Sequence, residues 1–393
     1  MKTLDLSHDV GALTQRPAWR DAIDRWWDAW LTSSAMYRWS VANPFTRWVT
    51  QRRARQVFDL MAGFVYSQVL LACVRLQILE KVAQSPRSLQ ELALMCQVSP
   101  HALQRLLQSA VALRLLEWRG PDRYGLGALG APVAGHPGLR AMIEHHAALY
   151  HDMHDPVALL RDQMPQSEMA AYWPYAQDAH QDGARSWQDD KVARYSELMA
   201  ASQPFVIDEV LAAYNFDAHQ QVLDVGGGKG GFVRRLAQHA SHLRLNLFDL
   251  PQVAAMAQQQ IDQNGMGQRI QTHGGDFLRD PLPGGADLVT LIRIAHDHPD
   301  GDVRTLLKAI HQALPVGGTL LLAEPMAQAP GQQPLGDAYF HFYLLAMGSG
   351  RLRTPTELSQ MMAEAGFTHI EEVPNAVPLQ TQILVGRKAQ CLP

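Results

Sequence analysis

A glycine-rich segment in the second half of the chain has the composition of a ligand-binding turn. The apolar run Val222–Val225, which includes Asp224, leads directly into Gly226, Gly228 and Gly230. An apolar strand that enters such a turn and a helix that leaves it bring backbone close to a ligand, where Cβ atoms would obstruct the approach. The segment therefore predicts a cofactor site between a strand and a helix.

The spacing within this turn separates the candidate cofactors. A phosphate loop needs Gly-Lys followed by Ser or Thr, but Lys229 is followed by Gly230, which disfavours a nucleoside triphosphate. The run from Gly226 to Gly231 satisfies the dinucleotide pattern G-x-G-x-x-G, so a nicotinamide oxidoreductase remains an alternative. The D-x-G-x-G-x-G spacing that begins at Asp224 fits better a cofactor with an amino-acid tail and no phosphates, namely S-adenosylmethionine.

Acidic and aromatic residues follow the next two β-like segments. Asp249 comes after the pattern at 243–248, where a carboxylate can accept hydrogen bonds from ribose hydroxyls. Asp276 and Phe277 follow the pattern at 269–274, where they could contact the adenine amino group and ring. Taken singly, Asp249 could be a helix cap and Phe277 a core residue. Their order after the glycine turn favours cofactor binding.

Histidine and carboxylates end the fourth and fifth strand patterns. Residues 287–294 run into His296, Asp297 and His298, and the following apolar strand pattern ends in Glu324. Parallel strands deliver such residues to the sheet edge where α/β proteins bind ligands. His296 can act as a general base near neutral pH, and a carboxylate such as Glu324 can hold one imidazole nitrogen and fix the tautomer. His298 is better explained as a structural histidine.

These residues must be positioned by alternating strands and helices. Six β-like segments between residues 221 and 386 alternate with helical ones, which predicts a parallel, doubly wound α/β sheet. The first half reads as mostly helical: an amphipathic helix over 18–31, then a second helical pattern from Trp48 to Ser85 with a break near Gly63.

Residues 88–130 follow a helix, turn, helix, hairpin order, which is a winged-helix pattern. Ser88 and Ser99 can cap its two helices. Nucleic-acid binding requires a basic footprint, but the second helix region offers Arg105 and Arg114 as its fixed positive charges. We expect a packing or dimerisation module here and no nucleic-acid partner, with a ligand-sensing winged-helix regulator as the alternative.

Length and composition support this organisation. The 393 residues exceed what one core usually supports, and a net charge of −4 argues against a protein dedicated to nucleic acid. We expect a Trp-rich basic extension over 1–54, a helical dimerisation and substrate-lining domain over 55–190, and a cofactor-binding domain over 191–393. Three scattered cysteines and an N-terminus without a signal-peptide core indicate a cytoplasmic protein.

Two apolar features of the first half bear on membranes. The stretch Leu60–Val74 is too short to span a bilayer and predicts a buried helix. Six of the nine tryptophans lie in the first 48 residues, and residues 1–60 carry nine Lys or Arg against six Asp. A tryptophan stripe beside arginines suits an interfacial helix on an anionic membrane. An aromatic dimer interface or domain clasp explains it equally well.

Several motifs together resemble one known family. LDVGGGKG, FDLP, GGDF, IAHDH and ALPVGGTLLLAE, within residues 192–388, are similar to the serial motifs of the plant-type S-adenosylmethionine-dependent O-methyltransferases. Residues 88–130 are similar to that family's dimerisation domain. The resemblance implies a Rossmann-like methyltransferase domain preceded by a mainly helical, winged-helix-like dimerisation domain, and therefore a homodimer that uses S-adenosylmethionine.

The resemblance also implies a role for each matching residue. It makes His296 the catalytic base, with Glu324 as its partner and Asp297 beside it. It implies no metal. The residues it assigns to the cofactor are Asp224, Gly226, Gly228, Gly230, Asp249, Leu250, Asp276, Phe277 and Arg293.

Two departures from the family pattern matter. His298 stands where members usually have Trp, and Leu352 stands where many carry a second catalytic Glu. The HDH variant, the tract from Phe58 to Glu80 and the Trp-rich extension resemble a bacterial branch, the carotenoid O-methyltransferases of purple photosynthetic bacteria. This branch implies methylation of a tertiary hydroxyl on an acyclic carotenoid, with a phenol, polyketide or other small aromatic acceptor as the alternative.

Four histidines that lie close together in the sequence could be interpreted as ligands of a metal site. This cluster lacks an alternating carboxylate pattern, so we prefer roles in the substrate pocket or on the surface. These residues are His145, His146, His151 and His154.

Overall fold

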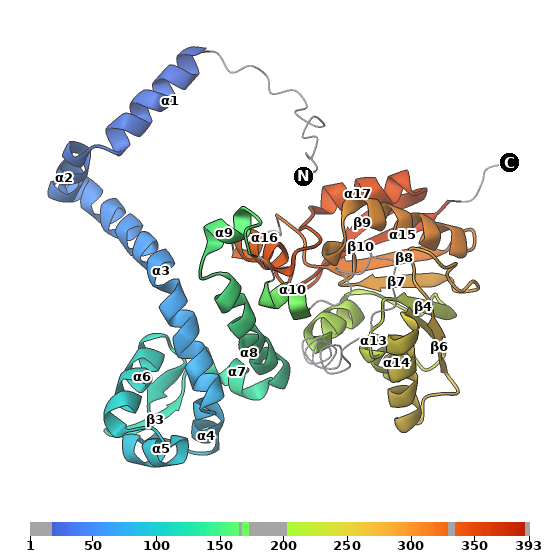
Figure 1. The fold of residues 1–393 in the computed structure, drawn as a ribbon, viewed down its shortest axis with the longest axis horizontal. Coiled ribbons are helices and arrows are strands. Elements are labelled where there is room, and N and C mark those ends of the chain that lie inside the picture. The colour runs from blue at the N-terminus through green and yellow to red at the C-terminus, as the bar shows by residue number, and fades with distance from the viewer. Residues whose placement is uncertain (1–17, 165–166, 173–202, 329–334, 390–393) are drawn as a thin grey trace. The chain divides into compact units, whose positions relative to one another are not determined.

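The computed structural model describes residues 18–164, 167–172, 203–328 and 335–389 (Figure 1). The chain forms two compact units, Met1–Ala72 and Cys73–Pro393. The predicted boundary at 190 lies outside the described residues, and residue 54 lies within a continuous helix. The three-part division at 54 and 190 therefore stays a prediction.

The first unit contains α1 (Ala18–Leu31), α2 (Ser34–Ala42) and most of α3 (Pro44–Arg75). The predicted helix over 18–31 is confirmed, whereas α2 was not predicted. The predicted break near Gly63 is wrong, because α3 runs unbroken for 32 residues. A lone helical glycine costs about 1 kcal/mol relative to alanine, which a long helix tolerates.

The prediction that Leu60–Val74 is a buried helix holds only for its last turn. Leu71, Cys73 and Val74 are buried, but Leu60 is 84% exposed and Phe64 72% exposed. The most apolar window of α3 has a mean hydropathy of 1.8 and is 17% buried, so its length and composition would allow a membrane span, although core helices of soluble proteins meet the same criterion. The sequence showed the apolar run, but it did not show that large side chains in the first half of this run are exposed.

The predicted helix, turn, helix, hairpin order is confirmed at the start of the second unit. Ser88 forms a capping box with Glu91, and Ser99 caps a helix whose first residue is Pro100. The hairpin pairs antiparallel, and a two-residue strand completes a small sheet in the order β1-β3-β2. These elements are α4 (Ile78–Gln84), β1 (Arg87–Ser88), α5 (Leu89–Cys96), α6 (Pro100–Ala112), β2 (Leu116–Trp118) and β3 (Arg123–Leu126).

A helical layer follows the hairpin in sequence and contacts a helix from much later in the chain. It comprises α7 (Gly130–Gly135), α8 (Pro137–Asp152), α9 (Pro156–Leu160) and α10 (Glu168–Tyr172). Helices α8, α9 and α10 pack against α16 (Leu335–Met347) around an apolar cluster that includes Leu149, Tyr343 and Leu352.

The rest of the second unit is built on a seven-stranded sheet in the order β6-β5-β4-β7-β8-β10-β9. Five strands are parallel, but β10 pairs antiparallel with both β8 and β9, so the predicted parallel sheet is corrected to a mixed one. The strands are β4 (Gln221–Val225), β5 (Arg244–Asp249), β6 (Ile270–Gly274), β7 (Leu288–Ile292), β8 (Thr319–Glu324), β9 (Phe367–Val373) and β10 (Gln382–Lys388).

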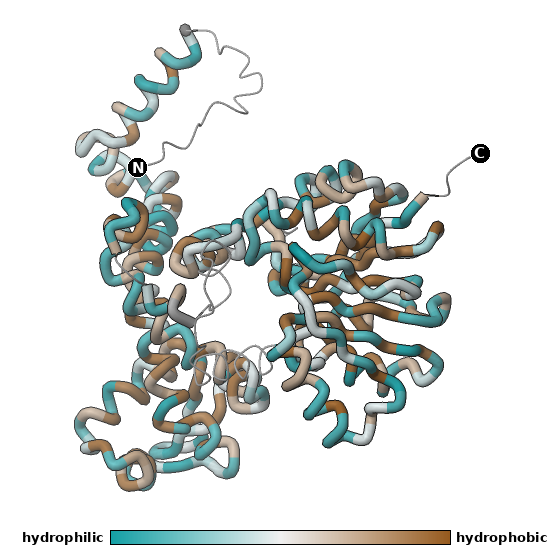
Figure 2. The backbone as a smooth tube through the Cα atoms, turned by 45° about the vertical axis from the view of Figure 1, so that its right-hand side comes forward, coloured by the Kyte–Doolittle hydropathy of each residue, from teal (hydrophilic) through white to brown (hydrophobic). Residues whose placement is uncertain are grey.

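Alternate residues of these strands enter two separate cores, which confirms the doubly wound arrangement. One core joins the strands to the helical residues 203–213, α13 (Gly231–His239) and α14 (Pro251–Gln263). The other joins them to α15 (Asp300–Ala313) and α17 (Pro355–Glu364). Hydrophobic stretches run along the strands of this sheet (Figure 2). Burial of both faces fixes the strand register, and with it the carboxyl edge where the predicted site residues lie.

Candidate active site

The glycine turn after β4 has the backbone geometry that its composition predicts. Gly226, Gly228 and Gly230 have φ values of +71°, +56° and +76°, a region that L side chains avoid. A Cβ on Gly227 would lie 2.6 Å from an Asp224 oxygen, and one on Gly231 would lie 2.5 Å from Gln203 Oε1. The positive φ values at three positions and the crowding at Gly227 therefore disfavour side chains in the turn.

Two carboxylates support this turn. Asp224 is 2% exposed and accepts a 2.7 Å hydrogen bond from Thr290 Oγ1. Asp249 accepts bonds from the main-chain N–H groups of Gly228 (2.8 Å) and Leu250 (2.7 Å). Burial raises the pKa of Asp224 to about 7 and that of Asp249 to about 6. The structure thus joins Asp249 directly to the glycine turn, as a residue of the same site should be.

His296 lies in the single turn η1 (Ala295–Asp297) after β7, between two carboxylates. Its Nε2 is 3.1 Å from Asp297 Oδ1 and its Nδ1 is 3.5 Å from Glu324 Oε2. Oε2 accepts its hydrogen bond, at 3.0 Å, from the main-chain N–H of His296. His296 Nδ1 and Glu324 Oε1 are buried without a hydrogen-bond partner. Glu324 is therefore beside the imidazole as predicted, but its bond goes to the backbone.

The two carboxylates determine the charge preference of this histidine. Burial would lower the pKa of His296, but Asp297 and Glu324 outweigh it, so that the pKa is raised above its usual value. Burial also raises the pKa of Asp297 to about 6, against the opposing effects of His296 and Arg293. An imidazole flanked in this way is a stronger base than a solvent-exposed one.

The remaining predicted cofactor residues lie at the same edge of the sheet. Phe277 makes an edge-to-face contact with His298, with ring centroids 5.3 Å apart, and Asp276 Oδ1 accepts a bond from the main-chain N–H of Leu278. Arg293 directly follows β7 in a left-handed conformation (φ 58°), and its charge acts on both His296 and Asp297. Contacts of these residues with a cofactor stay predictions.

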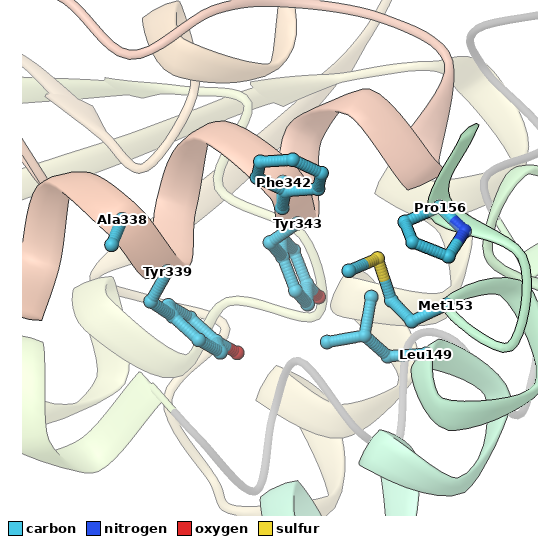
Figure 3. Close-up of a pocket in the computed structure, with 7 residues that line it drawn as sticks. All are labelled: Leu149, Met153, Pro156, Ala338, Tyr339, Phe342 and Tyr343. Atoms are coloured by element: carbon cyan, nitrogen blue, oxygen red, sulfur yellow. The ribbon is translucent and has the colours of Figure 1, made fainter. Parts of the chain in front are cut away.

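An apolar pocket of about 440 Å³ opens between the α8–α9 region and α16 (Figure 3). Leu149 and Met153 face Tyr343 across it. Burial raises the pKa of the Tyr343 hydroxyl, and the charges of Arg293 and Asp297, at the end of β7, also act on it. The full lining is Leu149, Met153, Pro156, Ala338, Tyr339, Phe342 and Tyr343.

Two histidines of α8 are hydrogen-bonded to the tyrosines of this pocket. His145 Nε2 is 3.1 Å from the Tyr343 hydroxyl, and burial lowers the pKa of His145 to about 4. His146 Nδ1 donates to the Met142 carbonyl, so its Nε2 must be the acceptor of the 2.7 Å bond from Tyr339. Both histidines thus contact tyrosines that line the pocket, and their role in a substrate pocket stays a prediction.

Sequence reasoning missed Tyr339 and Tyr343. They lie on α16, an apolar helix with a weak periodic pattern, and their contact with α8 joins segments that are far apart in the chain. The clustering of aromatic residues in YFHFY was the available signal. The other two histidines of the cluster, His151 and His154, are exposed.

Comparison with known families agrees with this arrangement. Residues 150–368 match the model of an O-methyltransferase domain, and residues 58–132 match that of an O-methyltransferase dimerisation domain. The match to the dimerisation-domain model includes the second half of α3, which contains the exposed apolar side chains described above.

Individual relatives show the same similarity along most of the chain. Demethylspheroidene O-methyltransferase of Cereibacter sphaeroides is 39% identical over 336 residues, 85% of this chain and 87% of that protein. The Rhodobacter capsulatus enzyme of the same name is 39% identical over 346 residues, 88% of this chain and 85% of that protein.

Solved structures share the fold. CalO1, a methyltransferase of calicheamicin biosynthesis in its SAH-bound form, superposes with a TM-score of 0.72 at 25% identity, covering 86% of this chain and 99% of that one. Human N-acetylserotonin methyltransferase in complex with SAM gives 0.71 at 24% identity, covering 86% and 98%.

Proposed function

The chain belongs to the S-adenosylmethionine-dependent O-methyltransferase family, and from that premise we propose that it methylates a tertiary hydroxyl of an acyclic carotenoid. The observation that carries the acceptor assignment is the 39% identity to demethylspheroidene O-methyltransferases over most of the chain. The apolar pocket of α8, α9 and α16 is consistent with a hydrocarbon acceptor, because apolar side chains dominate its lining.

We assign cofactor binding to the carboxyl edge of the sheet. When bound, S-adenosylmethionine supplies a methyl group on a positively charged sulfur. The glycine turn from Gly226 to Gly230 gives the close backbone approach that its amino-acid tail needs, and Asp249 lies where it can accept bonds from ribose hydroxyls. Asp276 and Phe277 are assigned to the adenine ring.

We assign the proton transfer to His296. A tertiary alcohol is a far weaker acid than a phenol, so its oxygen needs a base that acts as the methyl group arrives. Asp297 and Glu324 make His296 such a base by stabilising the imidazolium that forms. Holding acceptor and donor in line supplies much of the remaining rate enhancement.

Labelled methyl transfer tests the proposed acceptor directly. We expect purified protein with methyl-labelled S-adenosylmethionine to label a hydroxylated acyclic carotenoid, presented in detergent micelles. A panel of simple phenols in the same micelles should remain unlabelled. Label in the phenols alone would contradict the carotenoid assignment and would leave the methyltransferase assignment intact.

The N-terminal extension fits contact with a lipid surface, where such a substrate would be found. Trp26, Trp27 and Trp30 form a cluster with ring centroids 5.2–6.5 Å apart, and each is 37–61% exposed. Arg20 lies over the ring of Trp19, at 5.4 Å. Exposed tryptophans next to arginines are typical of helices that rest in the interface of an anionic membrane. We therefore propose peripheral membrane contact through α1.

Flotation with vesicles distinguishes membrane contact through α1 from a clasp between two copies of the chain. We expect the protein to float with phosphatidylglycerol vesicles, and the triple variant Trp26→Ser, Trp27→Ser, Trp30→Ser to float at least about tenfold less. The matched control is Trp118→Ser, an exposed tryptophan outside the extension. If the triple variant floated normally but became monomeric in solution, the stripe would be a clasp between two copies.

A further inference from the structure

A buried arginine forms hydrogen bonds to the backbone of the turn that contains His296. Arg353 is 0% exposed, and its guanidinium donates to the carbonyls of Ala295 (2.7 Å) and His298 (2.8 Å). It also bonds Asp300 Oδ1, at 2.7 Å from Nη2. Hydrogen bonds from Arg351, together with those from Arg353, lower the pKa of Asp300 to about 2, so this carboxylate stays ionised at any working pH. One side chain thus ties both ends of the turn to the start of α15.

The residues just before Arg353 hold the two remaining carbonyls of the turn. Arg351 N–H donates to the His296 carbonyl at 3.0 Å, and Ser349 Oγ donates to the Asp297 carbonyl at 2.5 Å. Gly350 lies between them with φ +75°, and a Cβ there would come within 2.1 Å of the His296 carbonyl oxygen. All four consecutive carbonyls from 295 to 298 are therefore bound by residues 349–353, which we call the turn clamp.

A turn of this kind needs such support. η1 has three residues, and a single 3₁₀ turn has poorer hydrogen-bond geometry than an α-helix. The imidazole of His296 must nevertheless stay between the carboxylates of Asp297 and Glu324. A shift of about 1 Å in a reacting group can cost on the order of 100-fold in rate.

We propose that Arg353 is a positioning residue: through the turn clamp it fixes the imidazole of His296 and the carboxylate of Asp297 in the geometry that accepts the proton. This inference rests on the proposed role of His296 as the base. Leu352, 3% exposed, packs in the apolar cluster with Leu149 and Tyr343, both of which line the pocket. The same segment thereby joins the apolar cluster next to the pocket through Leu352 and holds the base through Arg353.

Measuring kcat separately from KM and from cofactor affinity tests this role. For Arg353→Met we expect kcat to fall about 100-fold, with KM for the acceptor and the calorimetric Kd for S-adenosylhomocysteine changed less than about threefold. The matched control is Arg269→Met. Arg269 also donates to main-chain carbonyls, those of Ala237, Ala240 and Leu243, but at the amino ends of the strands. We expect this control to lose stability and keep its kcat.

Three results would overturn the proposal. They are an unchanged kcat in Arg353→Met, a parallel loss of kcat and cofactor affinity, or an equal fall of kcat in Arg269→Met. Should Arg353→Met fail to fold, Ser349→Ala removes the Asp297 carbonyl bond alone, and its kcat should fall about threefold to tenfold at constant KM. An unchanged kcat in Ser349→Ala would also contradict the proposal. Failure of the base assignment itself is distinguishable, because His296→Ala would then keep its turnover.

Discussion

Replacing His296 with alanine is expected to lower kcat by about 10²–10⁴-fold while the affinity for S-adenosylmethionine changes less than about twofold. The size follows from the weak acidity of an alcohol, whose proton must have an acceptor as the methyl group transfers. The binding of the cofactor is assigned to other residues, chiefly those of the glycine turn and Asp249. Single-turnover methyl transfer and calorimetry measure the two quantities independently.

The chain offers a matched control for this variant. His219 is also buried, with its Nε2 2.7 Å from the Tyr214 hydroxyl and its Nδ1 3.9 Å from Asp287, but it precedes β4, at the amino ends of the strands. His219→Ala should affect stability without reducing kcat. Wild-type turnover in His296→Ala, with cofactor still bound, would remove His296 from the mechanism.

The second large effect is expected in Asp249→Ala, whose dissociation constant for S-adenosylmethionine should rise about 10-fold to 100-fold. Loss of hydrogen bonds to a charged group costs about 1.5–3 kcal/mol, which corresponds to that range of affinity. The variant loses the proposed bonds to ribose and also the acceptor that holds the Gly228 N–H. Because burial raises the pKa of Asp249 to about 6, its protonation should weaken cofactor binding as the pH falls through about 6.

Asp287 provides the control for this carboxylate. It likewise accepts bonds from two main-chain N–H groups, those of Gln220 and Gln221, but at the amino end of β4 rather than beyond its carboxyl end. Asp287→Ala should leave cofactor affinity unchanged. Equal affinity in Asp249→Ala and the native protein, by isothermal titration at pH 7.5, would refute the ribose assignment.

Local signals in the sequence were enough to predict most of the fold. Helix caps at Ser88 and Ser99 and alternating apolar strands placed the winged-helix module and six of the seven sheet strands. The missed strand, β9 (Phe367–Val373), is mostly exposed, so it lacks the apolar run that revealed the others. The antiparallel pairing of β10 depends on that strand and could not be inferred without it.

The site residues likewise divide into those that local sequence signals predicted and those that they did not. Asp224, Asp249, His296 and Glu324 could be predicted because each lies at or just after the carboxyl end of a strand, and parallel strands share one carboxyl edge. Contacts between segments far apart in sequence had no local signal: the tyrosines of α16 on α8, and Arg353 on the His296 turn. The family resemblance indicated that Leu352 stands where many members carry a carboxylate, and the structure adds that the next residue, Arg353, hydrogen-bonds the turn that contains His296.

The pH dependence of single-turnover methyl transfer in native protein and His296→Ala is the most direct test of His296 as the base. Protonated His296 cannot accept a proton, and its carboxylate neighbours Asp297 and Glu324 raise its pKa above the usual value, whereas burial and Arg293 oppose this. We expect the native rate to fall as the pH drops through a midpoint above about 6.5, with Asp297 titrating near 6. The His296→Ala rate should be low and lack that transition, whereas the same transition at the same midpoint in both proteins would contradict the assignment.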